Sequence, residues 1–590
     1  MSLKDIIAPF YTWKRAFEKP YALKRPIDDR PGAARYRGFH KNDMEMCIGC
    51  GTCEAICQNA AIDMVPVEGI ETTGNDSGLR PKIDYGRCCW CALCVDICTT
   101  SSLTMSNEYI WVDTDPEAFR FVPGAEEKSW NSAESGYTRA ETYTLLAPER
   151  IDMPVLPPEE SVTSFIEMVK GYSREEAQRE ADRCVQCGIC VATCPAHMDI
   201  PDYIKAVREN DIEEGLRLLY QTNPFPAVCG RVCTHRCEDV CALAHTGDPI
   251  SIRWLKRYIA DQVSLSGYAD ILQQEMVPNG KKIAIIGAGP GGLTAAYYLA
   301  LLGYDITVFE SNERGGGMLR YGIPEYRLPY DQLDKDIEYI VSLGVKIAYN
   351  TRISEDVPFD SLMQTYGAIF FSTGLSLPYK IGIEGEEHPN VISGLEVLDD
   401  VTNGRKPNIG KTVAVIGGGN VAMDAARTAR RFGSDVTIIY RRREVDMPAD
   451  EEEIHDAKLE DVAIITQAIP LRIEDSENGQ VKFIWNKAKM IDDGPGRRPK
   501  PVPIEGETVT TVVDTIIAAI GQDGDFTFMS EAIEDTITFQ RGKVVTDEYG
   551  QTGEPKVFAG GDIVNRAADA ISAIADGHRA AKGIDQFLQG

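Results

Sequence analysis

Hydrophobic and polar positions follow the same order twice in the C-terminal half of the chain. Residues 281–310 begin with an apolar run, pass through a glycine-rich loop into apolar residues at helical spacing, and end with a second apolar run. Residues 411–443 repeat this order. Short apolar runs bounded by glycine are typical of buried strands, whereas apolar residues recurring every three or four positions are typical of a helix. Each segment therefore predicts a strand, a loop, a helix and a second strand of a parallel α/β sheet.

The loop of the first segment has the glycine spacing of a dinucleotide-binding site. Gly287, Gly289 and Gly292 permit a tight turn and let backbone amides approach a pyrophosphate at the N-terminus of the helix. Glu310 follows Gly287 by 23 residues, where an acidic side chain accepts a hydrogen bond from a ribose 2′-hydroxyl. Together these features predict a Rossmann-like domain, and the cysteine clusters described below favour FAD as its ligand.

The second segment has a glycine loop of the same kind, followed by arginines. Its loop residues are Gly417, Gly419, Asn420 and Ala422. At the 23-residue offset stands Tyr440, followed by Arg441, Arg442 and Arg443. An acid at this offset would repel a 2′-phosphate, whereas guanidinium groups form charge-assisted hydrogen bonds with it, so the segment favours NADPH over NADH. The alternative is a solvated basic strand end that pairs with the acids at 450–453.

Two segments near the N-terminus carry cysteines at Cys-x2-Cys-x2-Cys-x3-Cys spacing, and the second repeats the first 41 residues later. Three closely spaced thiolates bind three corners of a [4Fe–4S] cluster, and the fourth cysteine binds the other cluster. One cluster is therefore predicted on Cys47, Cys50, Cys53 and Cys98, and the other on Cys88, Cys91, Cys94 and Cys57. The alternative is zinc, which favours separated Cys-x2-Cys pairs. Cys89 is expected to be a packed thiol.

Eight further cysteines form two groups in the centre of the chain: Cys184, Cys187, Cys190 and Cys194, then Cys229, Cys233, Cys237 and Cys241. The first group repeats the ferredoxin spacing, whereas the second recurs every fourth residue. On a continuous helix the second group would span about 18 Å, which is too long for one cluster. Either the two groups share ligands or the helix is broken, and structural zinc is again the alternative.

The remaining segments complete a layout of several domains. Residues 1–41 carry ten Lys/Arg against four Asp/Glu, with prolines at 9, 20, 26 and 31. They predict either a poorly ordered arm or one that docks on an acidic partner subunit through Phe10, Tyr11, Trp13 and Phe17. The expected order is then a ferredoxin domain (42–114), a linker (115–160), a helical domain (161–275), an FAD domain (281–400 and 511–590) and an NADPH domain (401–510).

Local patterns refine this layout at three places. Helical periodicity starts at 161 and continues to 184, with Ser173 and Glu176 as a capping box that opens a second helix. Residues 66–82 read as a surface loop, and residues 511–520 as one buried strand. Gly560, Gly561 and Asp562 precede the last helix, for which Asp562 alone could be an N-cap.

Composition excludes several functional classes. The 590 residues have a net charge of −29, which disfavours nucleic-acid binding because a phosphate backbone would be repelled. No apolar run approaches the ~18 residues of a membrane span, and the N-terminus lacks an apolar signal core. Seventeen cysteines, sixteen of them in dense spacings, fit metal binding in a reducing compartment better than a secreted disulfide scaffold. The expected location is cytoplasmic.

The motifs carry a family resemblance over residues 150–590. The runs MPVLPPEESV, CPAHMDIP, PAVCGRVC and ISIRWLKRYIAD resemble the small subunit of glutamate synthase, the N-terminal half of dihydropyrimidine dehydrogenase and NADPH-binding subunits of ferredoxin-dependent transhydrogenases. The N-terminal module resembles bacterial two-cluster ferredoxins, although Gln58 and Thr99 replace the usual proline. The chain would then combine an α+β ferredoxin module, an α-helical [4Fe–4S] domain and two Rossmann-like α/β domains, with the NADPH domain interrupting the FAD domain.

The resemblance also implies particular site residues. It implies crossed ligation in the helical domain, with one cluster on Cys184, Cys187, Cys190 and Cys241 and another on Cys194, Cys229, Cys233 and Cys237. On the FAD side it implies contacts from the segments containing Gly316, Gly317 and Gly374, and from Gly561 and Asp562. The implied cofactors are FAD, four [4Fe–4S] clusters and NADPH or NADH as substrate.

These patterns predict an oxidoreductase subunit that exchanges electrons between NAD(P)H and ferredoxin or another redox subunit of a hetero-oligomeric complex, including an electron-bifurcating transhydrogenase. No general acid or base is expected, because hydride transfer requires positioning. One alternative is the NADPH-oxidising small subunit of glutamate synthase, which typically lacks the leading ferredoxin module. Another is a non-catalytic electron-wire subunit with an empty second dinucleotide site, against which the loop at 417–420 and the arginines argue.

Overall fold

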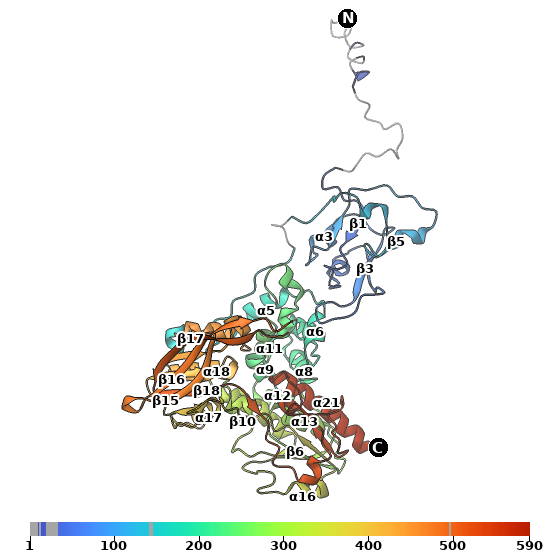
Figure 1. The fold of residues 1–590 in the computed structure, drawn as a ribbon. Coiled ribbons are helices and arrows are strands. Elements are labelled where there is room, and N and C mark those ends of the chain that lie inside the picture. Colours follow the sequence, from blue (N-terminus) through green and yellow to red (C-terminus); the bar gives the residue numbers. More distant parts are fainter. Residues whose placement is uncertain (1–9, 11–12, 14, 19–32, 141–144, 495–496) are drawn as a thin grey trace. The chain divides into compact units, whose positions relative to one another are not determined.

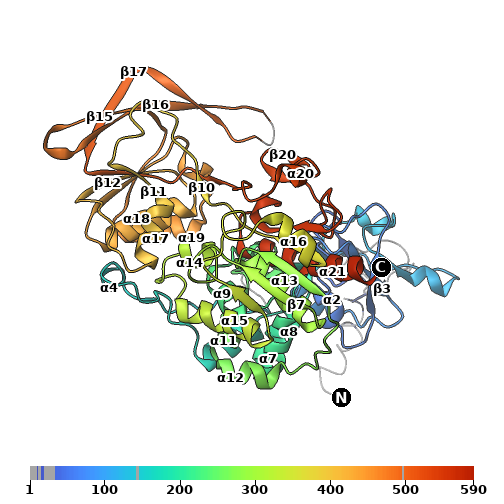
Figure 2. The ribbon, with the colours of Figure 1, turned by 90° about the horizontal axis from the view of Figure 1, so that it is seen from below.

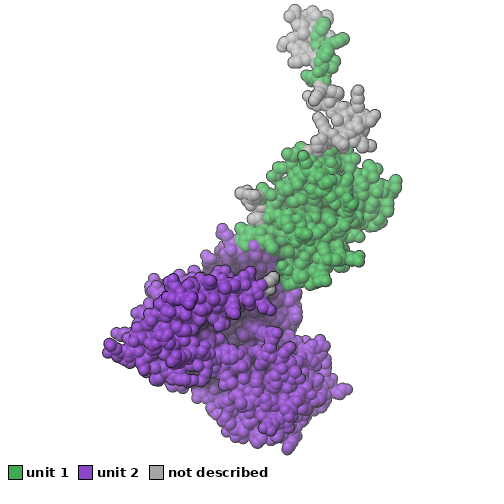
Figure 3. Space-filling view, viewed as in Figure 1, with its two compact units in different colours: residues 1–148, 245–247 green, residues 149–244, 248–590 purple. Residues whose placement is uncertain are grey.

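The computed structural model describes residues 10, 13, 15–18, 33–140, 145–494 and 497–590. Two compact units divide the chain: residues 1–148 with 245–247, and residues 149–244 with 248–590 (Figure 3). Within the described residues, no helix has the length and apolar character needed to cross a membrane. Tyr11 and the four N-terminal prolines lie outside the described residues, and Phe10, Trp13 and Phe17 are exposed.

The first unit has the α+β arrangement expected of a ferredoxin module (Figure 1). Strand β1 (His40–Asn42) pairs antiparallel with β4 (Leu103–Met105). A second sheet has the order β2 (Ile62–Pro66), β3 (Leu79–Asp84) and β5 (Arg120–Phe121). The short helices α2 (Thr52–Ala55) and α3 (Leu93–Asp96) each follow a residue in the left-handed region, Gly51 and Ala92. The strand β3 includes residues 79–82, so the expected surface loop is limited to 67–78.

The expected boundaries of this unit were wrong at both ends. Phe39 and His40, assigned to a basic arm, are buried, and Phe121 and Trp130, assigned to a linker, are buried in the same core. Trp130 stacks on Phe39 with ring centroids 4.2 Å apart. The contribution of these aromatic side chains to the core could not be predicted, because polar residues surround them in sequence and the pattern shows neither helical nor strand periodicity. The 3-10 turns η1 (Pro116–Phe119) and η2 (Ser129–Asn131) complete the segment.

Short helices form the cysteine-bearing part of the second unit. They are α4 (Pro158–Ser161), α5 (Arg174–Asp182), α6 (Ile189–Thr193), α7 (Ile200–Glu209), α8 (Ile212–Tyr220), α9 (Pro226–Val232), α10 (Arg236–Asp239), η3 (Ala242–His245), α11 (Ile252–Asp261) and α12 (Leu265–Ile271). The capping box of Ser173 and Glu176 is confirmed. The first of the two expected helices does not form, because residues 162–172 are irregular and Val169 forms a bridge with Val155.

Helix α9 packs closely on α11. A Cβ on Gly230 would lie 2.6 Å from Cα of Arg257, so only glycine permits this approach. The helix that was expected to be broken ends at Val232, and α10 starts after His235, which has a positive φ of 38°. Because the helix is broken, the four cysteines of 229–241 do not lie along one helix axis.

The first nucleotide-binding sheet is parallel, with the strand order β22, β9, β6, β7, β8. Its strands are β6 (Lys282–Ile286), β7 (Asp305–Phe309), β8 (Lys346–Ala348), β9 (Ala368–Phe371) and β22 (Val557–Ala559). The associated helices are α13 (Pro290–Leu301), α14 (Met318–Tyr321), α15 (Tyr330–Ser342), α16 (Phe359–Thr365), α20 (Glu531–Glu534) and α21 (Ala570–Gln589). Because β22 returns to pair with β9 after the second domain, the prediction of an interrupted Rossmann-like domain is confirmed.

The second parallel sheet has the order β11, β18, β12, β13, β14. Its strands are β11 (Val391–Ser393), β12 (Thr412–Ile416), β13 (Asp435–Ile439), β14 (Ala463–Ile465) and β18 (Thr515–Ala518), with helices α17 (Gly394–Thr402), α18 (Asn420–Arg431) and α19 (Glu451–Leu459). Strands β11 and β18 were assigned to the FAD domain by the expected boundaries, so the second domain extends from about 391 to 518. The expected single strand 511–520 is split at Asp514.

An antiparallel sheet covers one face of this second domain (Figure 2). It contains β15 (Ala468–Asp475), β16 (Val481–Ile491) and β17 (Lys500–Val513). Phe483 and Trp485 pack against Ala414 and Ile416 of β12, whereas Val413 and Val415 face the core formed with α18. Two short antiparallel pairs lie in the segments that connect the two nucleotide-binding sheets in sequence. They are β10 (Leu377–Pro378) with β19 (Gln522–Asp523), and β20 (Phe539–Gln540) with β21 (Lys543–Val544).

Candidate functional site

A cavity of about 1690 Å³ in the second unit is lined by both glycine loops. Each loop connects the end of a strand to the start of a helix, β6 to α13 and β12 to α18. Backbone amides at such helix starts are suited to bind phosphate groups. The cavity therefore places two loops suited to phosphate binding around one shared space.

The first loop requires glycine at the predicted positions. Gly287 has a φ of 101°, and a Cβ there would lie 2.6 Å from the carbonyl oxygen of Ser372. A Cβ on Gly292 would lie 2.0 Å from the carbonyl oxygen of Gly287. Gly289 lines the cavity and precedes the first turn of α13. The loop thus leaves its backbone open towards the cavity, as a pyrophosphate site needs.

Glu310 stands at the end of β7 and is buried in the wall of the cavity. One of its oxygens accepts a hydrogen bond from the Ala288 amide at 2.8 Å. The other accepts hydrogen bonds from the Asn312 amide and side chain, each at 2.9 Å. These donors hold the carboxylate beside the glycine loop, the position expected of a group that accepts from a ribose hydroxyl.

The other predicted FAD-side residues divide into two sets. Gly317, Gly374, Gly561 and Asp562 line the cavity, whereas Gly316 packs against Leu333 behind it. The Oδ1 atom of Asp562 is buried and without a hydrogen-bond partner among the described residues. Burial raises the pKa of Asp562 to about 6. The N-cap of α21 is Asp569, whose side chain accepts from the Ser572 amide, so the N-cap alternative for Asp562 is wrong.

The second loop repeats the geometry of the first. Gly417 has a φ of 147°, and a Cβ there would lie 2.0 Å from the carbonyl oxygen of Ala519. Gly419 and Asn420 line the cavity, and the Asn420 side chain accepts from the Asp450 amide at 2.9 Å. Ala422 is buried against the strand. Gly418, which sequence reasoning did not select, has no room for a Cβ because the ring of Tyr440 would lie 2.6 Å away.

The three arginines after Tyr440 have different surroundings. Arg441 and Arg442 line the cavity. Arg443 does not line it, and its guanidinium pairs with Asp446 at 2.8 Å. Arg498, in the loop between β16 and β17, lines the same cavity. It was missed because nothing in its local sequence pattern marks it. The alternative that these arginines pair with the acids at 450–453 is not what the described residues show, because Asp450 caps α19, Glu452 pairs with Arg253, and Glu453 pairs with Arg327 and Arg427.

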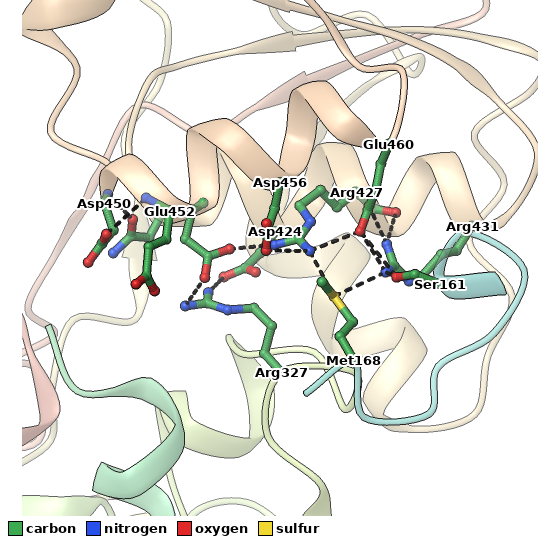
Figure 4. A network of polar contacts seen from close by, with 12 residues as sticks. Ser161, Met168, Arg327, Asp424, Arg427, Arg431, Asp450, Glu452, Asp456 and Glu460 are labelled. Atoms are coloured by element: carbon green, nitrogen blue, oxygen red, sulfur yellow. Dashed lines mark hydrogen bonds and ion pairs between the residues drawn. The ribbon is translucent and has the colours of Figure 1, made fainter. Parts of the chain in front are cut away.

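The acids of α19 belong to a buried network that joins separate parts of the second unit (Figure 4). Arg327 pairs with Asp424 and Glu453, each at 2.7 Å. Arg427 pairs with Glu453 at 2.6 Å and with Glu460 at 2.9 Å, and Glu460 also pairs with Arg431 at 2.6 Å. The network therefore connects the FAD-side loop at 327 with α18 and α19 of the second domain.

A second contact joins α19 to the cysteine-bearing helices. Glu452 pairs with Arg253 of α11 at 2.6 Å and lies 3.5 Å from His235. Although burial opposes ionisation, these two partners hold the pKa of Glu452 well below its usual range. The carboxylate is thus charged at neutral pH, and the second domain is attached to the loop between Cys233 and Cys237.

In the first unit, the contacts among the eight cysteines of the repeated spacing can be compared with the two expected sets of four. Burial and then the neighbouring thiols Cys50, Cys94, Cys47 and Cys98 raise the pKa of Cys53. Burial and then Cys88, Cys91 and Cys57 raise the pKa of Cys94. Cys47, Cys50 and Cys98 therefore lie near Cys53, and Cys57, Cys88 and Cys91 lie near Cys94, which is itself a neighbour of Cys53. Cys89 is exposed, so the packed-thiol prediction is wrong.

The second unit brings its eight cysteines into two similar sets. A small cavity is lined by Cys184, Cys187, Cys190 and Cys241. Burial lowers the pKa of Lys256, but Cys233, Cys229, Cys194 and Cys237 together raise it above the usual value, so these four thiols surround its buried ammonium. The grouping matches the crossed ligand sets that the family resemblance implies.

The spacing of the sulfurs distinguishes between metals. Two thiolates on one zinc lie at most about 4.6 Å apart, because each Zn–S bond is about 2.3 Å. Among the described residues, the group of three or more possible ligands whose atoms all lie within 4.8 Å is His235, Asp450 and Glu452, which contains no cysteine. Within the described residues, no three cysteine sulfurs therefore lie as close together as the ligands of one zinc ion.

The cysteine-bearing loop also reaches the nucleotide cavity. Val232, Thr234 and Arg236 line the cavity, and each is next in sequence to Cys233 or Cys237. Arg236 pairs with Asp569 at the start of α21 at 3.2 Å. One short loop therefore forms both a wall of the dinucleotide site and part of a cysteine set, a feature that sequence spacing could not reveal.

Sequence reasoning missed further residues close to the cysteines. His40 lies 3.4 Å from the sulfur of Cys94, and Lys256 is buried among the four cysteines described above. Neither carries a motif. A single histidine before a cysteine run, or a lysine inside an amphipathic helix, is normally a surface or core residue, so only the fold identifies them.

Protein-family profiles match three parts of the chain. Pyridine nucleotide-disulphide oxidoreductase matches residues 281–577, half of the chain. Dihydropyrimidine dehydrogenase domain II, 4Fe-4S cluster, matches residues 161–267. The 4Fe-4S dicluster domain matches residues 46–102.

Individual relatives agree with these profiles. The NADP(+)-dependent formate dehydrogenase subunit beta of Moorella thermoacetica is 41% identical over 428 residues, 68% of this chain and 60% of that protein. The NADPH-Fe(3+) oxidoreductase subunit beta of Geobacter sulfurreducens is 38% identical, over 68% of this chain and 63% of that protein. The chain thus spans less than two thirds of the length of these relatives.

A third relative is matched along almost its whole length. The glutamate synthase [NADPH] small chain of Escherichia coli is 33% identical over 476 residues, 76% of this chain and 99% of that protein. The resemblance to glutamate synthase small subunits is therefore confirmed. This chain belongs to the pyridine nucleotide-disulphide oxidoreductase family, in a group that resembles glutamate synthase small chains, and it carries 4Fe-4S domains ahead of its nucleotide-binding part.

Proposed function

We propose that this chain is an NADPH-dependent oxidoreductase subunit that exchanges electrons between NADPH and ferredoxin or a partner redox subunit, through FAD and four [4Fe–4S] clusters. The observation that carries the proposal is the loop at 229–237, which lines the dinucleotide cavity and bears cysteines of one set of four. A group bound by those cysteines would lie beside the cavity, so single electrons could pass between the two without a mobile carrier.

The two glycine loops have separate tasks in this proposal. The loop of Gly287, Gly289 and Gly292 would bind the FAD pyrophosphate, with Glu310 on the ribose and Gly317, Gly374, Gly561 and Asp562 along the rest of the cofactor. The loop of Gly417, Gly419 and Asn420 would bind NADPH, with Arg441 and Arg442 on its 2′-phosphate. Bound FAD supplies the conversion between two-electron hydride transfer and one-electron transfer. The chain contributes position and charge, so no acid–base residue is assigned.

The four sets of cysteines would hold the clusters. In the first unit these are Cys47, Cys50, Cys53 and Cys98, and Cys57, Cys88, Cys91 and Cys94. In the second unit they are Cys184, Cys187, Cys190 and Cys241, and Cys194, Cys229, Cys233 and Cys237. The open spacing of the sulfurs supports clusters over zinc. Iron analysis of anaerobically reconstituted protein is expected to give sixteen irons per chain if all four clusters form.

The names of the relatives support a partner subunit. Two of them are subunits beta, and the third is the small chain of a larger enzyme. A transhydrogenase assembly, including an electron-bifurcating one, would use both the NADPH site and the ferredoxin module of this chain. The small subunit of glutamate synthase is the second candidate, favoured by the match to 99% of the Escherichia coli chain. The ferredoxin module ahead of the matched region favours the first candidate.

Anaerobic titration of the reconstituted protein with NADPH, and separately with NADH, tests the proposal. We expect NADPH to bleach flavin absorbance first and cluster absorbance next, and NADH to act far more slowly at equal concentration. Equal or faster reduction by NADH would contradict the assigned specificity. If neither nucleotide reduces FAD-loaded protein that dithionite does reduce, the chain is an electron wire whose second dinucleotide site does not function.

A further inference from the structure

His40 is a buried histidine to which the proposed function assigns no role. It lies in β1 of the first unit and is 1% exposed. Its Nε2 atom is 3.4 Å from the sulfur of Cys94. On the other side of the ring, Nδ1 is 3.3 Å from the hydroxyl oxygen of Tyr85. The imidazole thus bridges a tyrosine and a cysteine of one set of four.

The hydrogen bonds around Tyr85 determine which nitrogen of His40 carries the hydrogen. The backbone amide of His40 donates to the Tyr85 hydroxyl oxygen at 3.1 Å. Among the described residues, Nδ1 of His40 is the acceptor within hydrogen-bond distance of the Tyr85 hydroxyl, so the hydroxyl hydrogen donates to Nδ1, which is then unprotonated. A ring whose Nδ1 accepts a hydrogen bond carries its hydrogen on Nε2, and that hydrogen points to Cys94.

Aromatic packing keeps the ring in this orientation. Trp90 stacks over His40 with ring centroids 6.1 Å apart and an interplanar angle of 25°. Tyr85 is held by Phe121 at 5.0 Å and by Phe39 at 5.4 Å. These contacts leave the imidazole no solvent-filled space in which to rotate, so the contact with sulfur is a fixed feature of the core.

At the equivalent position of the internal repeat, the described residues place a thioether and not an imidazole beside the sulfur. Cys53 precedes Cys94 by 41 residues and occupies the same place in its cysteine segment. The sulfur of Cys53 lies 3.9 Å from the thioether sulfur of Met64, which has no N–H group to donate. The contact with His40 is therefore not a consequence of the cysteine spacing, and it distinguishes one set of four from the other.

We propose that His40 is a positioning residue that raises the reduction potential of the cluster on Cys57, Cys88, Cys91 and Cys94 by donating its Nε2 hydrogen to the Cys94 sulfur. This inference rests on the proposed cluster. Reduction adds negative charge that is shared with the cysteine sulfurs, so a hydrogen bond to sulfur stabilises the reduced form. A hydrogen bond to a charged group changes an equilibrium by about tenfold or more, which for a one-electron couple is about 59 mV.

The experiment is a potentiometric titration of full-length, reconstituted protein, followed by low-temperature electron paramagnetic resonance. His40→Leu removes the donor, and His40→Gln keeps an N–H group at the end of a shorter side chain. His455→Leu is the matched control, because His455 is exposed on α19. In His40→Leu we expect the reduction potential of one couple to fall by the equivalent of about a tenfold change in its equilibrium constant. The potential should recover in part in His40→Gln and stay unchanged in the control.

Several outcomes separate this role from a structural one. If all couples of His40→Leu coincide with wild type at equal iron content, the proposal is overturned, even if thermal stability falls. If His40→Leu binds less iron, Tyr85→Phe carries the test, because loss of the hydroxyl frees the hydrogen to occupy Nδ1. A lower reduction potential of one couple in Tyr85→Phe supports the proposal. Reduction potentials that all equal those of wild type overturn it. Wild-type protein lacking clusters in the first unit would overturn the cluster assignment itself, as its iron content shows without any variant.

Discussion

Arg441 and Arg442 show how neighbouring residues of one type acquire different roles. Both line the dinucleotide cavity, whereas Arg443, one position further, is paired with Asp446 at 2.8 Å and lies outside the lining. A guanidinium already paired with a carboxylate has less to offer a phosphate. The sequence suggested three equivalent arginines, and the structure leaves two of them directed to the cavity.

Replacement of these arginines should therefore change nucleotide preference selectively. In Arg441→Ala and Arg442→Ala we expect the KM for NADPH to rise about ten- to a hundredfold, since each loses charge-assisted hydrogen bonds worth about 1.5–3 kcal/mol, while the KM for NADH stays near its wild-type value. Arg443→Ala is the control and should leave both KM values almost unchanged. A parallel rise for NADH and NADPH would show that the arginines support the fold of the loop instead of contacting a 2′-phosphate.

At the scale of elements, helix α15 of the first nucleotide-binding domain meets α9, which carries Cys229. Asp336 of α15 is 0% exposed, and its carboxylate accepts from the Val228 amide at 3.3 Å. Burial raises the pKa of Asp336 to about 7, although Lys335 opposes the shift. Its folded-state pKa is therefore above the ordinary value of an unfolded aspartate, and the folded protein binds the proton more tightly than the unfolded chain does.

This difference predicts a pH dependence of stability. The contribution of Asp336 is fully present below about pH 4, decreases as pH rises and the unfolded carboxyl ionises, and reaches its minimum above about pH 7. A shift of about three units corresponds to roughly 4 kcal/mol at most. We expect Asp336→Asn to lose less stability than wild type between pH 5 and pH 8, as measured by thermal unfolding midpoints at fixed ionic strength. Identical pH profiles for the two proteins would contradict the assignment.

The helices and parallel strands of the nucleotide-binding part followed from periodicity, because each has an apolar face or a continuous apolar run with glycine at its end. The capping box of Ser173 and Glu176 was equally local and equally predictable. Residues 162–172 were wrongly expected to be helical, since Val169 pairs with Val155 and this long-range contact outweighs a local propensity. Trp130 and Phe121 were missed for the same reason: their burial depends on partners far away in sequence.

At the scale of the whole molecule, the buried network of Figure 4 holds the NADPH-side domain within the second unit. Ser161, before the cysteine-bearing helices, donates to Glu460, which also pairs with Arg427 and Arg431. The Tyr326 ring lies 3.6 Å from the guanidinium carbon of Arg431. Buried charges are tolerated only when each has its partner, so removal of the Glu460 carboxylate should leave the buried guanidinium of Arg431 uncompensated, whereas Arg427 keeps Glu453.

Glu460→Gln should consequently destabilise the second unit by about 3–5 kcal/mol, the usual cost of breaking a buried ion pair. The expected readout is a fall of several degrees in the thermal unfolding midpoint, monitored by circular dichroism under anaerobic conditions. Asp475→Asn serves as the control, because Asp475 is 93% exposed and its contact with His388 should contribute little. Equal midpoints for Glu460→Gln and wild type would show that the network does not stabilise the unit.

The sequence by itself determined the chemistry of this protein: two dinucleotide loops, an arginine cluster and sixteen cysteines in repeated spacings. These features depend on residues close together in the chain, where backbone geometry relates spacing to position. Only the tertiary structure decided which arginines face the cavity, that the loop at 229–237 borders it, and that His40 contacts Cys94. Those relations join residues tens to hundreds of positions apart, and they arise from packing of the core, which no local pattern encodes.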